Sequence, residues 1–134
     1  MAKGLDKHKQ RLAQLSLFGK DLTRRAKHRC ELCQSSGVSL SIFEVPPVAL
    51  EPEFERCLFL CKDCTQQLKK FKQMDESHWY CLNHAVWSQI PVVQVLASSI
   101  LHQLKTPWAS ELLEQVYLTP EIESWVEETR KLLG

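Results

Sequence analysis

Cys30-Glu-Leu-Cys33 and Cys61-Lys-Asp-Cys64 are two copies of one short motif, and the residues around them decide the fold. A gap of two residues lets a tight turn direct both sulfurs of a pair at one metal ion, and two such turns complete the tetrahedral shell that zinc accepts. Four thiolates leave no open coordination position, so the ion would hold structure and would not activate water. The sequence therefore predicts one structural zinc ion, bound by Cys30, Cys33, Cys61 and Cys64.

The rest of the cysteine content fits a metal site in a reducing compartment. The chain opens with Met-Ala-Lys-Gly-Leu-Asp-Lys, which places charges where a secretory signal needs apolar residues, so we expect a cytoplasmic protein. In that setting metal explains the six cysteines better than disulfides do. A thioredoxin-like redox pair is disfavoured because that chemistry uses a single Cys-x-x-Cys. Cys57 and Cys81 lack a partner at ligand spacing and are expected to pack as small apolar residues. Cys57 or His28 would become a ligand only with a different pairing.

The segment between the two cysteine pairs predicts a β-hairpin. Val38, Leu40 and Ile42 alternate with polar residues until the run Glu44-Val-Pro-Pro47 stops the strand, because proline cannot continue a ladder. A second apolar run, 57–60, is placed to pair with it. The sequence after Cys64 favours a helix, so the order is a cysteine turn, a hairpin and a second cysteine pair at a helix start. This order is typical of a treble-clef-like zinc finger.

The N-terminal segment predicts a basic helix with a break near Gly19. Its apolar residues recur at helical spacing, and these are Leu5, Leu12, Leu15, Phe18, Leu22 and Ala26. Residues 1–29 carry nine Lys or Arg against two Asp, a local balance of 9 − 2 = +7, although the whole chain has a formal charge of only +1. Two interpretations remain open for the basic residues, a solvated outer helix face or a surface that binds nucleic acid.

The C-terminal half predicts helices throughout. One helix should begin near Ser88, with Pro91 in its first turn, and its apolar residues exceed what one buried face requires. This 88–104 helix is therefore either central in the core or the contact surface of a homo-oligomer. Polar residues interrupt it, and it is shorter than the roughly 20 residues that cross a bilayer, so no membrane span is expected. Thr106-Pro107 and Thr119-Pro120 each resemble an N-cap followed by proline at the first helical position.

The length favours one core. With 134 residues and 44% apolar content, two independent cores would each be marginal. We divide the chain into a basic helical segment at 1–29, a zinc-binding treble-clef-like lobe at 30–74 and a helical lobe at 75–134, packed as one compact unit. The predicted fold class is mostly α with a small β-hairpin.

A second motif lies in residues 75–96, which are dense in aromatic and polar side chains. Two interpretations remain open, a polar-aromatic binding pocket or a hydrogen-bonded joint between the zinc lobe and the helices. The residues concerned are His78, Trp79, Asn83, His84 and Trp87.

The order of the zinc elements invites comparison with HNH nucleases, which place a catalytic metal on the same frame through histidines of the hairpin and helix. Here the corresponding strand, Ser41-Ile-Phe-Glu-Val-Pro46, contains no histidine, and neither does the helix after Cys64. The nuclease interpretation therefore lacks its chemistry.

Several segments in fixed order carry a closer resemblance. These are Cys30-Glu-Leu-Cys33, Phe43-Glu-Val-Pro-Pro47, Leu60-Cys61 to Cys64, His78-Trp79 with Cys81-Leu-Asn83, and Trp87-Ser88 with Pro91-Val-Val-Gln-Val95. Over about residues 20–126 the chain resembles the N-terminal region of bacterial PhnA-domain proteins, named after the alkylphosphonate utilisation operon. Longer members continue into a small SH3-like barrel, so the resemblance implies a stand-alone first part. It implies a zinc site and a bacterial cytosolic setting, and it supplies no reaction.

The sequence thus favours a non-catalytic zinc-binding adaptor or regulatory module. Its partner would contact either the basic N-terminal helix or the 78–87 segment. A nucleic-acid-binding protein that uses the basic N-terminus is one alternative, with affinity that falls as salt rises. An enzyme is the other, with His78 or His84 as acid or base in a tryptophan-lined pocket. No nucleophile, phosphate-binding glycine loop or open metal site supports the enzyme.

Overall fold

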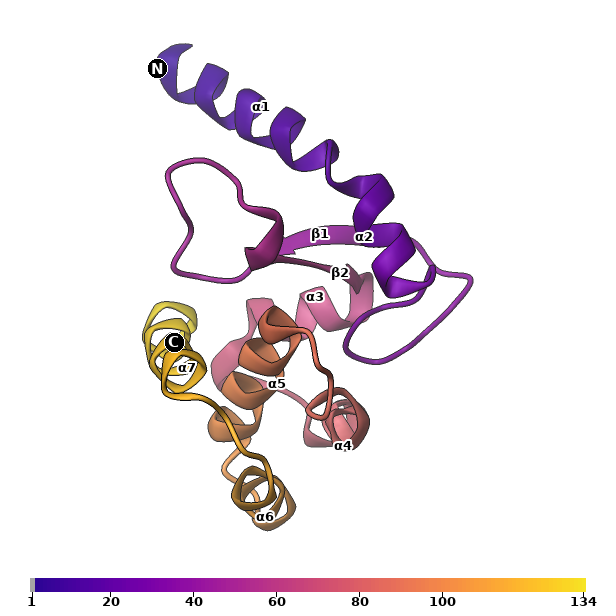
Figure 1. Cartoon of the computed structure of the whole chain (residues 1–134), viewed down its shortest axis with the longest axis vertical. Helices are drawn as coiled ribbons and strands as arrows, with labels where there is room; N and C mark the ends of the chain where they lie inside the picture. The colour runs from indigo at the N-terminus through magenta and orange to yellow at the C-terminus, as the bar shows by residue number, and fades with distance from the viewer. Residues whose placement is uncertain (1) are drawn as a thin grey trace.

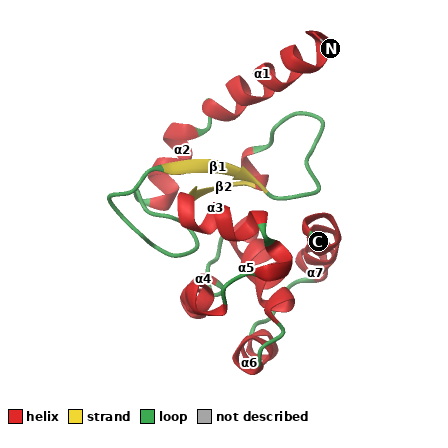
Figure 2. Cartoon of the chain, turned by 180° about the vertical axis from the view of Figure 1, so that it is seen from behind, coloured by secondary structure: helices red, strands yellow, loops and turns green. Residues whose placement is uncertain are grey.

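The computed structural model describes residues 2–134, with side chains from residue 6 onward, so Leu5 of the predicted apolar stripe lies outside the described side chains. The elements run in the order α1 (Ala2–Ser16), α2 (Gly19–Ala26), β1 (Leu40–Glu44), η1 (Phe54–Arg56), β2 (Cys57–Cys61), α3 (Lys62–Lys69), η2 (Phe71–Gln73), η3 (Glu76–Cys81), α4 (Leu82–Ala85), α5 (Pro91–Leu104), α6 (Pro107–Gln115) and α7 (Pro120–Leu133). The predicted class, mostly α with a small hairpin, is confirmed (Figure 2).

The hairpin connects the two cysteine turns. β1 and β2 pair antiparallel, with Leu40 opposite Cys61 and Glu44 opposite Cys57. Val38, expected to begin the first strand, lies outside it and is 48% exposed. α3 follows β2 without a loop, so Cys64 lies in its first turn. The predicted order of turn, hairpin and helix is therefore present (Figure 1).

Helix α5 is the centre of the helical part. It packs against α4, α6, α7 and the hairpin strand β2. Its residues 92, 93 and 95–101 are all buried, including the apolar ones that fall outside a single helical face. The structure confirms the central-core interpretation, because other elements of the same chain cover this apolar excess. The helix begins at Pro91, three residues after the predicted start, and Ser88 lies in the preceding turn, where its hydroxyl accepts a hydrogen bond from the Ile90 amide.

The two Thr-Pro sequences do open helices, but only one threonine side chain caps. The Thr119 hydroxyl accepts a hydrogen bond from the Ile122 amide at the start of α7. The Thr106 side chain makes no such bond, and its oxygen is buried without a partner among the described residues. Thr106 therefore occupies the predicted N-cap position of α6, with Pro107 after it, but its side chain makes no capping hydrogen bond. Pro107 lowers the demand for a cap there, since proline removes one of the amide donors that a helix start leaves unpaired.

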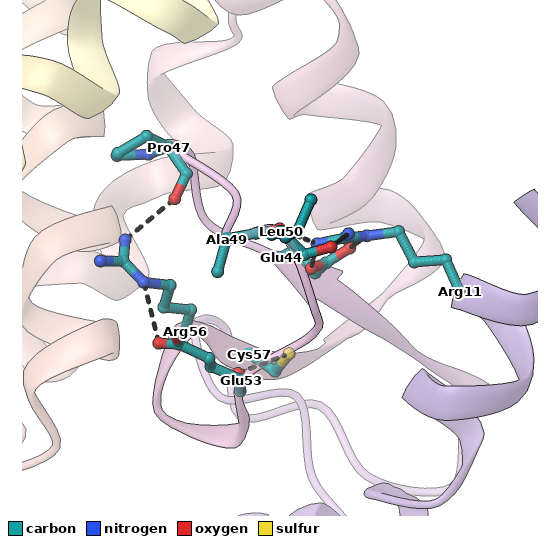
Figure 3. Close-up of polar contacts among 8 residues, drawn as sticks. All are labelled: Arg11, Glu44, Pro47, Ala49, Leu50, Glu53, Arg56 and Cys57. Carbon is teal, nitrogen blue, oxygen red and sulfur yellow. Dashed lines mark hydrogen bonds and ion pairs between the residues drawn. The ribbon is translucent and has the colours of Figure 1, made fainter. Parts of the chain in front are cut away.

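Helix α1 extends away from the hairpin (Figure 1). One arginine attaches it to the body, because the Arg11 guanidinium donates to both Glu44 carboxylate oxygens, at 2.9 and 2.6 Å. The same group donates to the carbonyls of Ala49 and Leu50 at 2.9 and 3.0 Å (Figure 3). The predicted apolar stripe is buried only toward the body, at Leu15 and Leu22, whereas Leu12 is 53% exposed. Helix α1 is therefore held to the hairpin region by the contacts of Arg11 and is only partly packed.

A second set of contacts joins the long hairpin connection to α7. Arg56 donates to the Pro47 carbonyl at 2.9 Å and to Glu53 at 3.3 Å (Figure 3). Its guanidinium also lies 5.1 Å from the ring centroid of Trp125 on α7. The Trp125 indole in turn donates to the Pro46 carbonyl.

Among the described residues, none of the helices has the length and apolarity that a membrane crossing requires.

Candidate metal centre

The four predicted cysteines converge on one point. Their sulfurs all lie within 4.8 Å of one another, and this is the one group of three or more candidate metal-ligating side chains within residues 6–134, whose side chains the structure describes. The sulfurs of Cys30 and Cys64 are 3.7 Å apart, and those of Cys33 and Cys61 are 3.6 Å apart. With zinc–sulfur bonds of about 2.3 Å, the edge of a tetrahedral shell measures about 3.8 Å. The separations therefore suit one tetrahedral ion and are too long for disulfides, whose sulfurs lie about 2.05 Å apart.

Local backbone geometry directs the sulfurs inward. In the first turn, the Gln34 amide donates to the Cys30 carbonyl, and Gln34 itself adopts a positive φ of 67°. In the second, Cys61 ends β2 and acts as the N-cap of α3, with its sulfur accepting a hydrogen bond from the Cys64 amide at 3.4 Å. The second pair therefore sits at a helix start, as predicted, where the helix dipole favours thiolate charge.

Close packing and burial shift the pKa values of Cys30, Cys61 and Cys64. The hydrogen bond between the sulfurs of Cys30 and Cys64 lowers the pKa of Cys30 to about 4. The same bond raises the pKa of Cys64, with burial adding to it, and burial raises the pKa of Cys61 to about 11. Four thiolates cannot coexist in this space without a positive charge, because each repels the others in a poorly solvated site. A divalent cation supplies that charge.

An ion pair beneath the first cysteine turn secures it to the rest of the chain. Glu31, between the two ligands, has a side chain only 4% exposed and accepts hydrogen bonds from Arg25 at 2.8 and 3.0 Å. It also accepts from the Phe59 amide at 2.8 Å, while Arg25 donates to the Cys57 carbonyl. One buried carboxylate thus connects α2, the cysteine turn and β2. This pair was not predicted from the sequence, where the available signal was a glutamate between two cysteines, six residues after an arginine.

His78 belongs to the metal centre. Its Nε2 lies 3.3 Å from the sulfur of Cys64, which is within hydrogen-bond distance of a thiolate acceptor. Trp79 beside it is fully buried in the core. These two neighbouring residues therefore contact the second cysteine pair on one side and the hydrophobic core on the other. The specific contact of His78 with a ligand was not predictable from spacing, because η3 brings it there from 14 residues away.

The other three residues of that motif lie elsewhere. Asn83 is exposed, and its side-chain amide donates locally to the Tyr80 carbonyl. His84 and Trp87 are also exposed, and both line a cleft of about 320 Å³ on the side of α2 and the first cysteine turn. The motif is therefore divided, with a buried part at its start and an exposed surface at its end. Trp79 is fully buried and therefore does not belong to this exposed surface.

The two remaining cysteines stand apart from the centre. Burial raises the pKa of the Cys57 thiol to about 11 and that of Cys81 to about 12, so both remain protonated. Each thiol donates to a nearby carbonyl, Cys57 to Glu53 and Cys81 to His78. Cys57 is fully buried, as expected for a packing residue, and Cys81 is half-buried. His28 is exposed in the turn after α2 and forms no part of the cysteine cluster.

Comparison with family models, with curated proteins and with solved structures finds no match to this chain.

Proposed function

We propose that this chain is a non-catalytic zinc-binding adaptor or regulatory module. The observation that supports it most is the convergence of four sulfurs within 4.8 Å, three of them from buried residues. Zinc suits this set because it accepts four thiolates in a tetrahedral shell without distortion, and softer sulfur ligands select it over magnesium or calcium. A shell closed by four thiolates has no position for water or substrate, so the ion would be structural.

The structural role of the metal follows from what it joins. The ligands come from the turn before β1, the end of β2 and the first turn of α3, and His78 adds a hydrogen bond from the helical part. Fixing these elements would hold the basic arm, α1 and α2, and the exposed end of the 75–96 motif in place. The order of elements favours a treble-clef-like finger. Together with the motifs that follow one another in the sequence, it also favours membership of the PhnA family and a bacterial cytoplasm.

Nucleic-acid binding through the basic arm is the second candidate. The three ion pairs of the described residues use Arg11, Arg25 and Arg56. Other exposed cations of the arm and the turn after it remain without an acidic partner, namely Lys7, Lys9, Lys20, Arg24, Lys27 and Arg29. Such a surface attracts phosphates by counterion release, which makes the affinity salt-dependent.

The enzyme alternative has less support. The two candidate bases of such an enzyme are separated in the structure. His78 contacts the candidate metal ligand Cys64, and His84 lies in the exposed later part of the 75–96 motif. The sulfur that His78 contacts is that of Cys64, which this proposal assigns to the metal, and the contacts described above pair His84 with no nucleophile.

Replacement of His78 by alanine tests whether this histidine serves the metal or a substrate. We expect the affinity for zinc to fall about 10- to 100-fold, because the hydrogen bond to the Cys64 thiolate is lost. Competition with a chromophoric chelator measures this change. His84→Ala is the matched control, since His84 is exposed and outside the cluster, and its zinc affinity should equal that of the wild type. Unchanged affinity in His78→Ala, or an equal loss in both variants, would contradict a role of His78 at the metal.

A further inference from the structure

The cleft between the first cysteine turn and the turn before α5 has the features of a binding site that the metal does not use. Its volume of about 320 Å³ is at the small end of the range of ligand sites, roughly 300 to 1,000 Å³. Its lining includes Lys27 and Gln34 from the region of the first cysteine turn, and His84 and Trp87 from the segment before α5. The lining therefore combines a cation, hydrogen-bonding groups and an aromatic ring.

Trp87 differs from the other tryptophans of the chain. Trp79 is fully buried, and the indole N–H groups of Trp108 and Trp125 donate to Glu76 and to the Pro46 carbonyl. Trp87 is 51% exposed, and its indole has no hydrogen-bond partner among the described residues. An exposed indole is a stacking surface for another planar ring, and its N–H is available to an acceptor on that ring.

The charge in and around the cleft favours an anionic ligand. The acidic residue in its lining, Glu31, is neutralised by Arg25 and buried beneath the surface. Lys27 carries the unpaired charge of the lining, and the exposed Arg24 and Arg29 flank it in the chain. Lys27 and His28 both hold a positive φ, of 56° and 61°, so the turn that carries these cations has a defined backbone shape. A planar ring and a phosphate are the two chemical groups that this arrangement matches.

We propose that the cleft binds single-stranded nucleic acid, with one base stacked on Trp87 and its phosphate beside Lys27. Neighbouring phosphates contact the exposed cations of α2, so the inference rests on the nucleic-acid candidate above and assigns its specific site. A single strand is favoured over a duplex because its bases present free faces. Stacking on an aromatic side chain contributes about 1–3 kcal/mol per base with little dependence on sequence.

The test uses the full, zinc-loaded chain and labelled homopolymers of about 12 nucleotides, a length within the range of such sites. Fluorescence anisotropy is measured with oligo(dT), oligo(rU) and a DNA duplex over a salt series. We expect Trp87→Ala to weaken binding to either single strand about 10-fold or more, as lost stacking requires. Lys27→Gln should lower the slope of log affinity against log salt by about 0.7, the value for one phosphate contact on a single strand. The duplex should bind more weakly than both single strands.

Two controls separate the cleft from general charge and aromaticity. Tyr117→Ala removes an aromatic side chain that is 82% exposed between α6 and α7, and Lys131→Gln removes an exposed lysine of α7. Both should bind as the wild type does. If Trp87→Ala binds single strands with the affinity of the wild type and with a steep salt dependence, the proposed cleft site is wrong and the basic arm remains the binding site. No salt-dependent binding by the wild type would overturn both, while the zinc content of the same samples tests the metal module independently.

Discussion

Cys64→Ser is expected to abolish stoichiometric metal binding and to unfold the part of the chain around the hairpin. Cys64 is fully buried, and its sulfur contacts both Cys30 and His78. Binding of structural zinc in comparable small sites contributes roughly 10 to 16 kcal/mol, coupled to folding. The whole free energy of unfolding of a domain is about 5 to 15 kcal/mol, so loss of the ion removes most or all of it. Zinc content and far-ultraviolet circular dichroism before and after chelation measure the effect.

Cys81→Ser is the matched control. This cysteine is half-buried, donates to the His78 carbonyl and lies outside the cluster, and a serine hydroxyl can make the same hydrogen bond. The variant should retain about one zinc per chain and a stability close to that of the wild type. A Cys64→Ser protein that keeps its metal and its dichroism would show that the four sulfurs do not hold the fold together.

Arg25→Met is expected to lower the free energy of unfolding of the zinc-loaded protein by about 3 to 5 kcal/mol. The change leaves the Glu31 carboxylate, only 4% exposed, without its counter-charge beneath the cysteine turn. It also removes the hydrogen bond to the Cys57 carbonyl, so α2 loses a polar contact with β2 and keeps the packing of Leu22 against Cys57. Urea unfolding followed by circular dichroism gives the difference.

Two further variants isolate the cause of that loss. Arg24→Met changes the neighbouring exposed arginine and should alter stability by less than about 0.5 kcal/mol. The double variant Arg25→Met/Glu31→Gln also removes the uncompensated negative charge of Glu31. The glutamine keeps an oxygen that can accept a hydrogen bond from the Phe59 amide. It should recover part of the stability, because an apolar or neutral replacement of both partners costs less than removal of one. A double variant less stable than Arg25→Met would contradict the charge explanation.

Much of this architecture was accessible from the sequence because its signals are local. The spacing of the two Cys-x-x-Cys pairs placed the metal site, and alternation of apolar residues up to Pro46-Pro47 predicted the hairpin. Proline at the first helical position identified the starts of α6 and α7. The apolar excess on the 88–104 helix indicated either burial or a partner, and only the packing of α5 among its neighbours separates the two.

The parts that the sequence did not reveal depend on tertiary contacts. The pairing of Arg11 with Glu44 joins residues 33 positions apart, and His78 reaches Cys64 through the irregular η3 segment. The division of the 75–96 motif has the same origin. Trp79 is buried in the core while Trp87, eight residues later, is exposed, although each side of that division contains one histidine and one tryptophan. Residue types alone therefore indicated a special segment without locating which side chains face the metal and which face solvent.

X-ray absorption at the zinc edge, on protein purified without chelators, tests the central claim most directly. We predict about one zinc per chain with four sulfur neighbours at about 2.3 Å and no nitrogen or oxygen in the first shell. Absence of stoichiometric zinc, or a first shell in which a light atom replaces one of the sulfurs, would contradict the closed structural centre on which the account depends.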